Sequence, residues 1–161
     1  MHYTGFINLS LDMRMTYPLK KIQLKTSGFT EVVPLPFVHM GSPIFLQGNS
    51  MPGPTWDEIV LMHSLARIYF YNTIDNIQAS WVKLGHDGAK VLLNSGVNDL
   101  GGTLINENIS RASGANHGQE TTATEFINLI KDAGKIPYLR NTLYTSFKNL
   151  EGVSNQNVIK I

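Results

Sequence analysis

The stretch of residues 96–119 constrains the fold more than any other part of the sequence. Its first half alternates apolar and polar residues and closes at Gly101-Gly102. Its second half carries Glu107 and Arg111 four residues apart, ahead of Gly114. That order predicts a strand, a tight glycine turn and a short helix. A strand that passes into a helix through such a turn indicates an α/β fold.

Polar residues gather where this predicted strand ends. Asn98, Asp99 and Thr103 lie at its carboxyl end, which is where open and closed α/β sheets bind ligands. Asn and Asp also form turns and cap helices wherever a strand passes into a helix, so a local structural role is the alternative. Glu107 and Arg111 are candidates for the same site, or they form only a surface ion pair one helical turn apart.

A second strand is expected at residues 77–84. Alternation places Gln78 and Ser80 on one face and Trp81 and Lys83 on the other. Small polar residues suit the inside of a barrel, so Gln78 and Ser80 are the candidates for lining a binding site. Trp81 either packs in the core or stacks on a flat substrate ring, and Lys83 either binds a carboxylate or reaches solvent.

An earlier strand is expected at residues 29–35, where Val32 and Val33 favour extended structure. The loop of residues 37–54 is long for a connection between a strand and a helix, and such loops are commonly functional or disordered. His39 follows the strand, near the mouth of a barrel site. It is a candidate for substrate binding, although a single His is more often a structural hydrogen-bonding residue.

Two capping boxes predict where helices begin, at Thr55-Trp-Asp-Glu58 and at Thr122-Ala-Thr-Glu125. The helix after Thr55 carries His63 and Arg67, which we interpret as part of a packing or solvated face. Three further elements are predicted: one or two helical turns at residues 19–26, a helix at residues 87–95 ended by Gly96, and a last strand at residues 137–144 with Arg140 at its middle.

Several motifs together resemble a known family. Residues 96–119 read Gly-x-Asn-Asp-Leu-Gly-Gly-Thr-Leu and then Glu-Asn-Ile-Ser-Arg-Ala-x-Gly-Ala-x-His-Gly-Gln. With residues 28–40, 52–56 and 75–85, they resemble the carboxyl-terminal half of the radical S-adenosylmethionine enzymes that build the deazaflavin precursor of coenzyme F420. Within that family the chain resembles the tyrosine-using 4-hydroxybenzyl transferase subunit of FO synthase, and the resemblance runs from about residue 23 to residue 144.

This resemblance implies the later strands of a (β/α)8 TIM-type barrel. We expect the barrel to be incomplete, because such barrels typically need about 250 residues and the chain has 161. Residues 19–146 would form the half-barrel. Residues 1–18 do not match the family and are expected to be weakly ordered or to form a makeshift strand, and residues 147–161 are expected to be a tail.

The resemblance also implies cofactors and substrates. The complete family enzyme uses S-adenosylmethionine and a [4Fe–4S] cluster held by a Cys-x3-Cys-x2-Cys motif. This chain has no cysteine, so we expect it to bind no such cofactor and to be inactive alone. The implied substrates are tyrosine and 5-amino-6-(D-ribitylamino)uracil. We interpret the chain as a carboxyl-terminal piece, from a truncated gene or a split enzyme, that needs an amino-terminal half or a paralogue as partner.

Two alternatives remain open. The related menaquinone-pathway radical enzyme that acts on futalosine derivatives shares the Gly-x-Asn-Asp strand end. An inactive interaction module is the other alternative, because an open half-barrel exposes strand edges and apolar surface.

Composition excludes some partners. Lys and Arg number 13 against 12 Asp and Glu, and the net charge of +1 makes nucleic acid an unexpected partner. No apolar run approaches the roughly 18 residues of a membrane span, so we expect no membrane partner and a cytoplasmic location.

Overall fold

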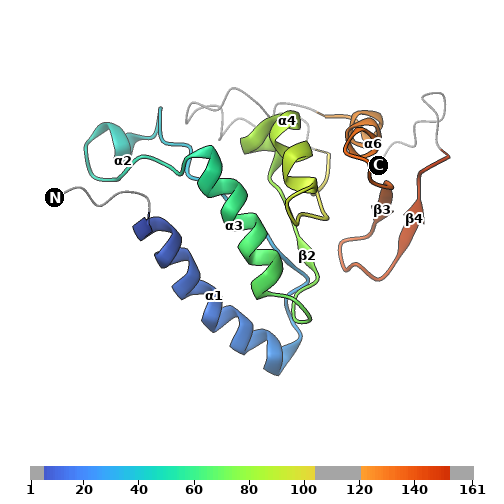
Figure 1. The fold of residues 1–161 in the computed structure, drawn as a ribbon, viewed down its shortest axis with the longest axis horizontal. Helices are drawn as coiled ribbons and strands as arrows, with labels where there is room; N and C mark the ends of the chain where they lie inside the picture. Colours follow the sequence, from blue (N-terminus) through green and yellow to red (C-terminus); the bar gives the residue numbers. More distant parts are fainter. Residues whose placement is uncertain (1–5, 104–120, 153–161) are drawn as a thin grey trace.

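A computed structural model describes residues 6–103 and 121–152 of the chain (Figure 1). Helices alternate with short strands through most of this part of the sequence. In chain order the elements are α1 (Phe6–Thr26), β1 (Glu31–Val32), α2 (Pro43–Leu46), α3 (Trp56–Tyr69), β2 (Asn76–Ile77), α4 (Trp81–Leu93), α6 (Ala123–Asp132), β3 (Tyr138–Arg140) and β4 (Phe147–Asn149).

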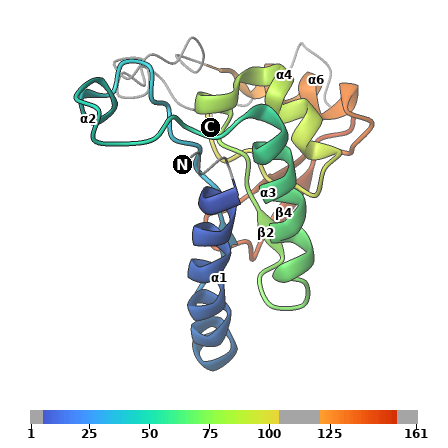
Figure 2. The ribbon, with the colours of Figure 1, turned by 60° about the vertical axis from the view of Figure 1, so that its left-hand side comes forward.

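Three extended segments run parallel to one another. β1 pairs with β2 in the register that places Val32 beside Ile77, and Gln78 forms a single parallel bridge with Asp99. α3 connects the first two segments, and α4 connects the second to the third (Figures 1 and 2). Two consecutive βαβ units therefore make up the middle of the chain.

α1 lies beside α3 and is fixed by its second half (Figures 1 and 2). The Lys20 ammonium donates to the backbone carbonyl of Tyr69 at 2.7 Å. The buried amide of Gln23 donates to the carbonyls of Phe29 and Thr73 at 3.0 Å each and accepts from the Phe29 N–H at 2.8 Å. These bonds join α1 to the segments that precede β1 and β2.

The expected makeshift strand within residues 1–18 is wrong, because α1 already begins at Phe6. The alternating run that suggested a strand is only five residues long. A helix fixed at Lys20 and Gln23 can extend toward the amino terminus, because propagation adds a hydrogen bond for each residue except where Pro18 removes a donor. No helix in the described residues is long and apolar enough to cross a membrane.

The core lies between α3, α4 and the parallel strands. Phe70, Ile77 and Leu92 are fully buried there. Trp81 is also in this core, and its indole N–H donates to the Gly102 carbonyl at 3.2 Å. Of the two roles open to Trp81, core packing is therefore the one that the structure gives it.

The expected strand at residues 77–84 is wrong beyond Ala79. Pairing ends where the Ala79 N–H donates to the Asp99 carbonyl at 2.9 Å, and Ser80 is already the N-cap of α4. The buried positions that follow recur with helical spacing, which the local alternation hid. They are Trp81, Val82, Gly85, Ala89, Leu92 and Leu93. Gly85 breaks the helix with φ 69° and ψ 176°, a conformation that favours glycine.

β3 and β4 form an antiparallel hairpin, with Leu139 opposite Lys148. The side-chain oxygen of Asn141 holds the turn by accepting from the N–H of Thr145 at 2.9 Å and of Ser146 at 3.2 Å. An Asn side chain that replaces backbone partners in this way is common in turns.

This hairpin changes two sequence-based boundaries. The last strand expected at residues 137–144 ends at Arg140, and the expected tail at 147–161 is wrong in its first part because it contains β4. Leu150, which follows β4, is buried, and its N–H donates to the Pro137 carbonyl at 2.9 Å. The chain is therefore fixed to the fold at least as far as Leu150.

Both predicted capping boxes are present. Thr55 accepts from the Glu58 N–H at 3.4 Å while the Glu58 carboxylate accepts from the Thr55 N–H at 2.7 Å. Thr122 and Glu125 repeat the pattern at the start of α6, and these hydrogen bonds lower the pKa of the Glu125 carboxyl. Gly96, the predicted left-handed cap after α4, has φ 105°.

We expect Thr55→Ala to lower the free energy of unfolding by about 1 kcal/mol, because the variant leaves an amide of the first turn of α3 without its acceptor. Thr55→Ser keeps the hydroxyl and is the matched control. Urea denaturation followed by circular dichroism measures both. Equal stability of the two variants would contradict a stabilising role for this cap.

Candidate functional site

Arg140 of β3 is the centre of a charged cluster. Its guanidinium donates from Nη2 to Asp99 Oδ1 at 3.0 Å and from Nε to Asp99 Oδ2, so the two groups meet in a bidentate pair. Nη2 also lies 3.5 Å from Glu31 Oε2. The hydrogen bonds to Asp99 raise the pKa of Arg140 further, which keeps its positive charge fixed.

Tyr144 completes this cluster. Its hydroxyl donates to Glu31, and its ring lies under the Arg140 guanidinium, with 4.0 Å between Cζ and the ring centre. Burial, followed by the hydrogen bond to Glu31, raises the pKa of the Tyr144 hydroxyl. The backbone of Tyr144 has φ 55°, an uncommon value for an aromatic residue, and such strain persists only where neighbouring contacts hold it.

The parallel strands explain how the cluster is assembled. Glu31 comes from β1 and Asp99 from the segment that pairs with Gln78, with β2 between them. Arg140 therefore spans β2 to reach both carboxylates. Because successive side chains of a strand point to opposite faces, Glu31 faces this cluster and Val32 faces the core on the other side.

A cavity of about 1020 Å³ opens beside the cluster. Its charged wall includes Asp99, Arg140 and Tyr144, and Thr103 also lines it. Its apolar wall comes mainly from the end of α4, from α6 and from the β3–β4 hairpin. That wall includes Leu93, Val97, Leu100, Phe126, Ile127, Ile130, Leu139 and Phe147. An apolar space with a few convergent polar groups is typical of small-molecule sites.

The structure gives Asn98 several protein partners. Its side-chain oxygen accepts from the Ile77 N–H at 2.9 Å and from Arg67 Nη2 at 2.6 Å, and its amide donates to the Asp75 carbonyl at 3.2 Å. Arg67 also donates to the carbonyls of Asp75 and Gly96. Arg67 thus belongs to a packing face, and Asn98 holds the start of β2 against the neighbouring strand.

Asp99 has both a local and a distant role. Its Oδ1 accepts from the Gly101 N–H at 2.6 Å, which fixes the glycine turn, and the same carboxylate binds Arg140. Gln78 lies against this turn, because a Cβ added to Gly101 would come within 2.5 Å of Gln78 Nε2. Gln78 thus brings its side-chain amide to the glycine turn at the end of the strand.

The other predicted site residues lie apart from this cluster or outside the described residues. Ser80 caps α4 without a side-chain hydrogen bond to the helix. His39 accepts from the Gly53 N–H at 2.9 Å and packs against Phe45, so it holds the two ends of the long loop together. Glu107 and Arg111 lie outside the residues that the structure describes.

Sequence reasoning did not select Glu31, Arg140 or Tyr144 as site residues. The available signal was a charged side chain within a short apolar strand, Glu31 before Val32-Val33 and Arg140 after Leu139. A charged side chain at such a position needs a hydrogen-bonding or oppositely charged partner when the strand is buried. The sequence of the strand does not show which residue that partner is.

The side chains of this chain do not fit an iron–sulfur cluster. Such clusters are held by thiolates, and the sequence contains no cysteine. Within the described residues, no group of three or more His, Asp or Glu side chains could hold a metal ion either.

We expect Arg140→Met to lower the free energy of unfolding by about 2–3 kcal/mol. This lies between the ~0–1 kcal/mol of an exposed pair and the ~3–5 kcal/mol lost when a buried charge is left alone. The Asp99 side chain is only 7% exposed and would lose its positively charged partner. Urea denaturation measures the change.

Lys148→Met, on the exposed strand beside β3, is the control and should change stability by less than about 0.5 kcal/mol. The double variant Arg140→Met with Asp99→Asn should recover part of the loss, because it removes the unpaired charge. A double variant no more stable than Arg140→Met would contradict this explanation.

His63 predicts a pH dependence of stability. Burial lowers its pKa below the ordinary value of 6.5, with a hydrogen bond to the Ile59 carbonyl opposing the shift. The unfolded chain therefore binds a proton near pH 6.5 while the folded chain does not, so stability falls as pH drops below 6.5. His63→Phe should flatten the stability profile between pH 7 and pH 5. Identical profiles for both proteins would exclude His63 as the cause.

The sequence matches a known protein family over most of its length. Residues 26–153 match the family described as the CofH/MqnC C-terminal region. The chain is 49% identical over 132 residues to the 5-amino-6-(D-ribitylamino)uracil–L-tyrosine 4-hydroxyphenyl transferase of Methanothermobacter thermautotrophicus, over 82% of this chain and 36% of that protein. For the transferase of the same name from Methanopyrus kandleri, the values are 50% over 130 residues, 81% and 35%.

The chain is also 48% identical over 126 residues to the FO synthase of Mycobacterium leprae, over 78% of this chain and 15% of that protein. It thus aligns with 36% or less of the length of each of these three relatives. Most of the described residues, including the whole Arg140 cluster, fall within the matched region, and the chain belongs to the CofH/MqnC C-terminal family.

Proposed function

We propose that this chain supplies the carboxyl-terminal part of a transferase that joins a tyrosine-derived 4-hydroxybenzyl group to 5-amino-6-(D-ribitylamino)uracil. The observation that carries the proposal is the identity of 49% over 132 residues to a protein with that transferase name. The family description covers two branches, but the three relatives described above are named as this transferase or as FO synthase. The deazaflavin reaction is therefore favoured over the menaquinone-pathway alternative.

The proposed architecture is a partial (β/α)8 barrel made of its later strands. Its support is the run of parallel segments β1, β2 and residue 99, connected by α3 and α4 in the order that barrels use. In this proposal, the face that carries Glu31, Asp99 and Arg140 is the inside of the barrel, and α3 and α4 belong to the outer layer. The Arg140–Asp99 pair holds the β3–β4 hairpin beside the last parallel segment.

Within this arrangement the chain's own residues would bind and orient substrate. Arg140 is held by two carboxylates, so it acts as a positioning residue that fixes Asp99 and Tyr144. Thr103, which lines the cavity, and Gln78, whose amide offers a donor and an acceptor beside the glycine turn, are the candidates for direct contact. Substrate contacts of His39, Ser80, Asn98, Asp99, Glu107 and Arg111 stay predictions.

The radical chemistry of the family needs groups from elsewhere. An iron–sulfur cluster with S-adenosylmethionine supplies the radical in the complete enzyme, and the cluster ligands would come from another polypeptide region, since this chain has no cysteine. The contribution assigned to this chain is confined to substrate binding, orientation and closure of the barrel.

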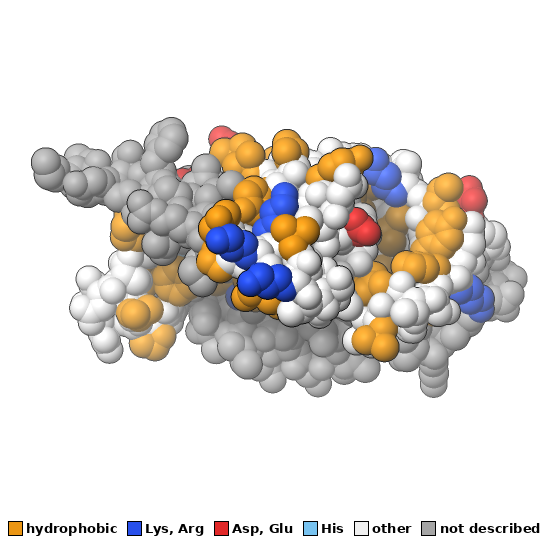
Figure 3. Space-filling model, turned by 90° about the horizontal axis from the view of Figure 1, so that it is seen from below, with side chains coloured by type: hydrophobic (Ala, Val, Ile, Leu, Met, Phe, Trp, Pro, Cys, Tyr) orange, Lys and Arg blue, Asp and Glu red, His pale blue; other side chains and the backbone are white. Residues whose placement is uncertain are grey.

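The surface of the described residues supports the proposal that a further polypeptide region packs against this chain. Viewed from below, hydrophobic and basic side chains lie side by side (Figure 3). Leu24, Ile68 and Tyr71 are each about 70% exposed, near the end of α1 and of α3. Within the described residues β1 pairs only with β2, so its other edge is available to a further strand. We propose that an amino-terminal barrel half or a paralogue covers this edge.

A chimera tests the function. In the Methanothermobacter thermautotrophicus transferase, the segment aligned with residues 26–153 is replaced by those residues of this chain. We expect the chimera to form the 4-hydroxybenzyl adduct from tyrosine and the diaminouracil, because the grafted region keeps the barrel face and its cluster. Mass spectrometry of the product measures this.

The recipient protein with that segment deleted is the negative control, and a melting curve shows whether the chimera folds. A folded chimera that makes no adduct would overturn the transferase proposal and favour the inactive interaction module.

A further inference from the structure

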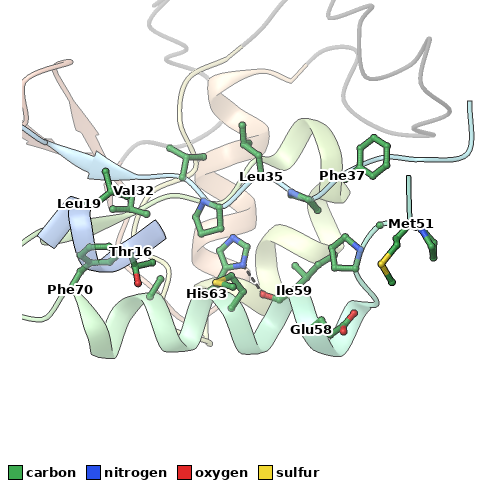
Figure 4. Close-up of a pocket in the computed structure, with 18 of the residues that line it drawn as sticks. Thr16, Leu19, Val32, Leu35, Phe37, Met51, Glu58, Ile59, His63 and Phe70 are labelled. Carbon is green, nitrogen blue, oxygen red and sulfur yellow. Dashed lines mark hydrogen bonds between the residues drawn. The ribbon is translucent and has the colours of Figure 1, made fainter. Parts of the chain in front are cut away.

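A second cavity lies on the opposite side of β1 from the Arg140 cluster. It has a volume of about 580 Å³ and is enclosed by α1, α3, the chain after β1 and the loop before α3 (Figure 4). Val32 lines it, whereas its neighbour Glu31 faces the charged cluster. The strand itself therefore separates the two spaces, and this cavity is distinct from the proposed transferase site.

The cavity follows α3 along most of the helix. The lining residues from this part of the chain recur at intervals of three or four positions and so lie on one face of the helix. They are Glu58, Ile59, Met62, His63 and Ala66, together with Phe70 just after the helix ends. A rise of about 1.5 Å per residue places residues 58 and 70 roughly 18 Å apart. The space is therefore elongated, which suits an extended chain better than a compact ring system.

The walls of this cavity offer a ligand mainly apolar surface. Prolines, methionines and aliphatic side chains make up most of them, including Pro34, Pro36, Pro52, Pro54, Leu19, Val33, Met51 and Met62. Two polar atoms nearby, Nε2 of His63 and the hydroxyl oxygen of Ser50, are buried beneath this surface and are not accessible to a ligand. A hydrocarbon chain is stabilised in such a space, whereas a polar group would lose its hydration without replacement.

Apolar side chains also surround the entrance to the cavity. Leu35, Phe37 and Met51 line it and are exposed to solvent, so the cavity reaches the molecular surface at these residues (Figure 4). A volume of this size, with an apolar interior and an apolar rim, is typical of small-molecule sites.

A negative charge marks one end of the cavity. Glu58 is the charged residue among the described side chains that line it, apart from the buried His63. Its Oε2 accepts from the N–H and the hydroxyl of Thr55 at 2.7 Å and 3.0 Å, which fixes the carboxylate at the start of α3. Asp57 adds a second negative charge in the same helical turn, and the helix end offsets only about half a charge. This end of the cavity therefore favours a cation.

We propose that this cavity binds an unbranched alkyl chain that carries a cationic head group. The chain lies along α3 between the helix and the chain after β1, and the head group lies in solvent beside Glu58. An alkyl chain with an anionic head group binds more weakly, because the same carboxylate repels it. The proposal does not depend on the transferase function.

The test uses the full 161-residue chain and a series of soluble probes. n-Butylammonium, n-hexylammonium and n-octylammonium share one head group and differ in chain length. Isothermal titration calorimetry should show a dissociation constant that falls about tenfold for every two methylenes, as expected when the chain is buried. No binding of n-octylammonium, or equal binding of all three probes, overturns the proposal.

Cavity-filling variants locate the chain. Ile59→Trp places a larger side chain in the cavity from α3, and Val33→Phe does so from the chain after β1. Each should weaken binding of n-octylammonium about tenfold or more. Leu61→Trp adds the same ring at an exposed position of α3 outside the cavity and should bind like the original chain. Unchanged binding by either filling variant, shown to be folded by a melting curve, overturns the proposal.

Glu58→Gln tests the head group. Gln keeps an oxygen for the cap of α3 and removes the charge. The original chain should bind n-octylammonium about fivefold more tightly than n-octanoate, which has a chain of the same length and the opposite charge. The variant should lose most of this preference and keep the dependence on chain length. Equal binding of the two probes by the original chain, or a full preference in Glu58→Gln, contradicts the assigned position of the cation.

Discussion

The pairing of one guanidinium with two carboxylates joins segments of this chain that are far apart in sequence. Arg140 binds Asp99, 41 residues earlier, and it also lies beside Glu31 at the start of the parallel strands. Within the described residues, the β3–β4 hairpin pairs only with itself. The polar contacts that hold the hairpin to the parallel segments therefore come from Arg140 and from Tyr144 in the hairpin turn. Because the fork of an arginine matches a carboxylate in two places, the contact fixes orientation as well as distance.

Tyr144 links the charged cluster to the backbone conformation of the hairpin turn. A left-handed aromatic residue is unfavourable by itself, yet here the ring lies against Arg140 and the hydroxyl reaches Glu31, 113 residues away. The Asn141 side chain organises the turn that presents Tyr144 in this position. The conformation of the turn and the charged cluster thus support each other, as expected where strain is kept at a site with several constraints.

Features fixed by neighbours in sequence could be predicted, and features fixed by distant partners could not. The caps at Thr55 and Thr122 follow from a pattern four residues long, and the structure confirms both. The strand expected at residues 77–84 fails because the alternation there fits a strand locally, while the bridge between Gln78 and Asp99 decides where pairing ends. Asn98 and Asp99 lie at the end of the next parallel segment, where the sequence places them, and their role in substrate binding stays a prediction. The partner of Asp99 was not predicted, because nothing near Asp99 in the sequence indicates Arg140.

The two neighbouring residues of β1 face different chemical environments. Glu31 faces a charged cluster, and Val32 faces the core and an apolar cavity that contains one neutral histidine. A shift of the β1–β2 register by one residue would exchange these faces and place a carboxylate in the apolar layer. Such a state would leave Arg140 and Tyr144 without their partner and bury an unpaired charge beside His63. The short pairing of Val32 with Ile77 is therefore maintained by the chemistry on both sides, more than by its few backbone hydrogen bonds.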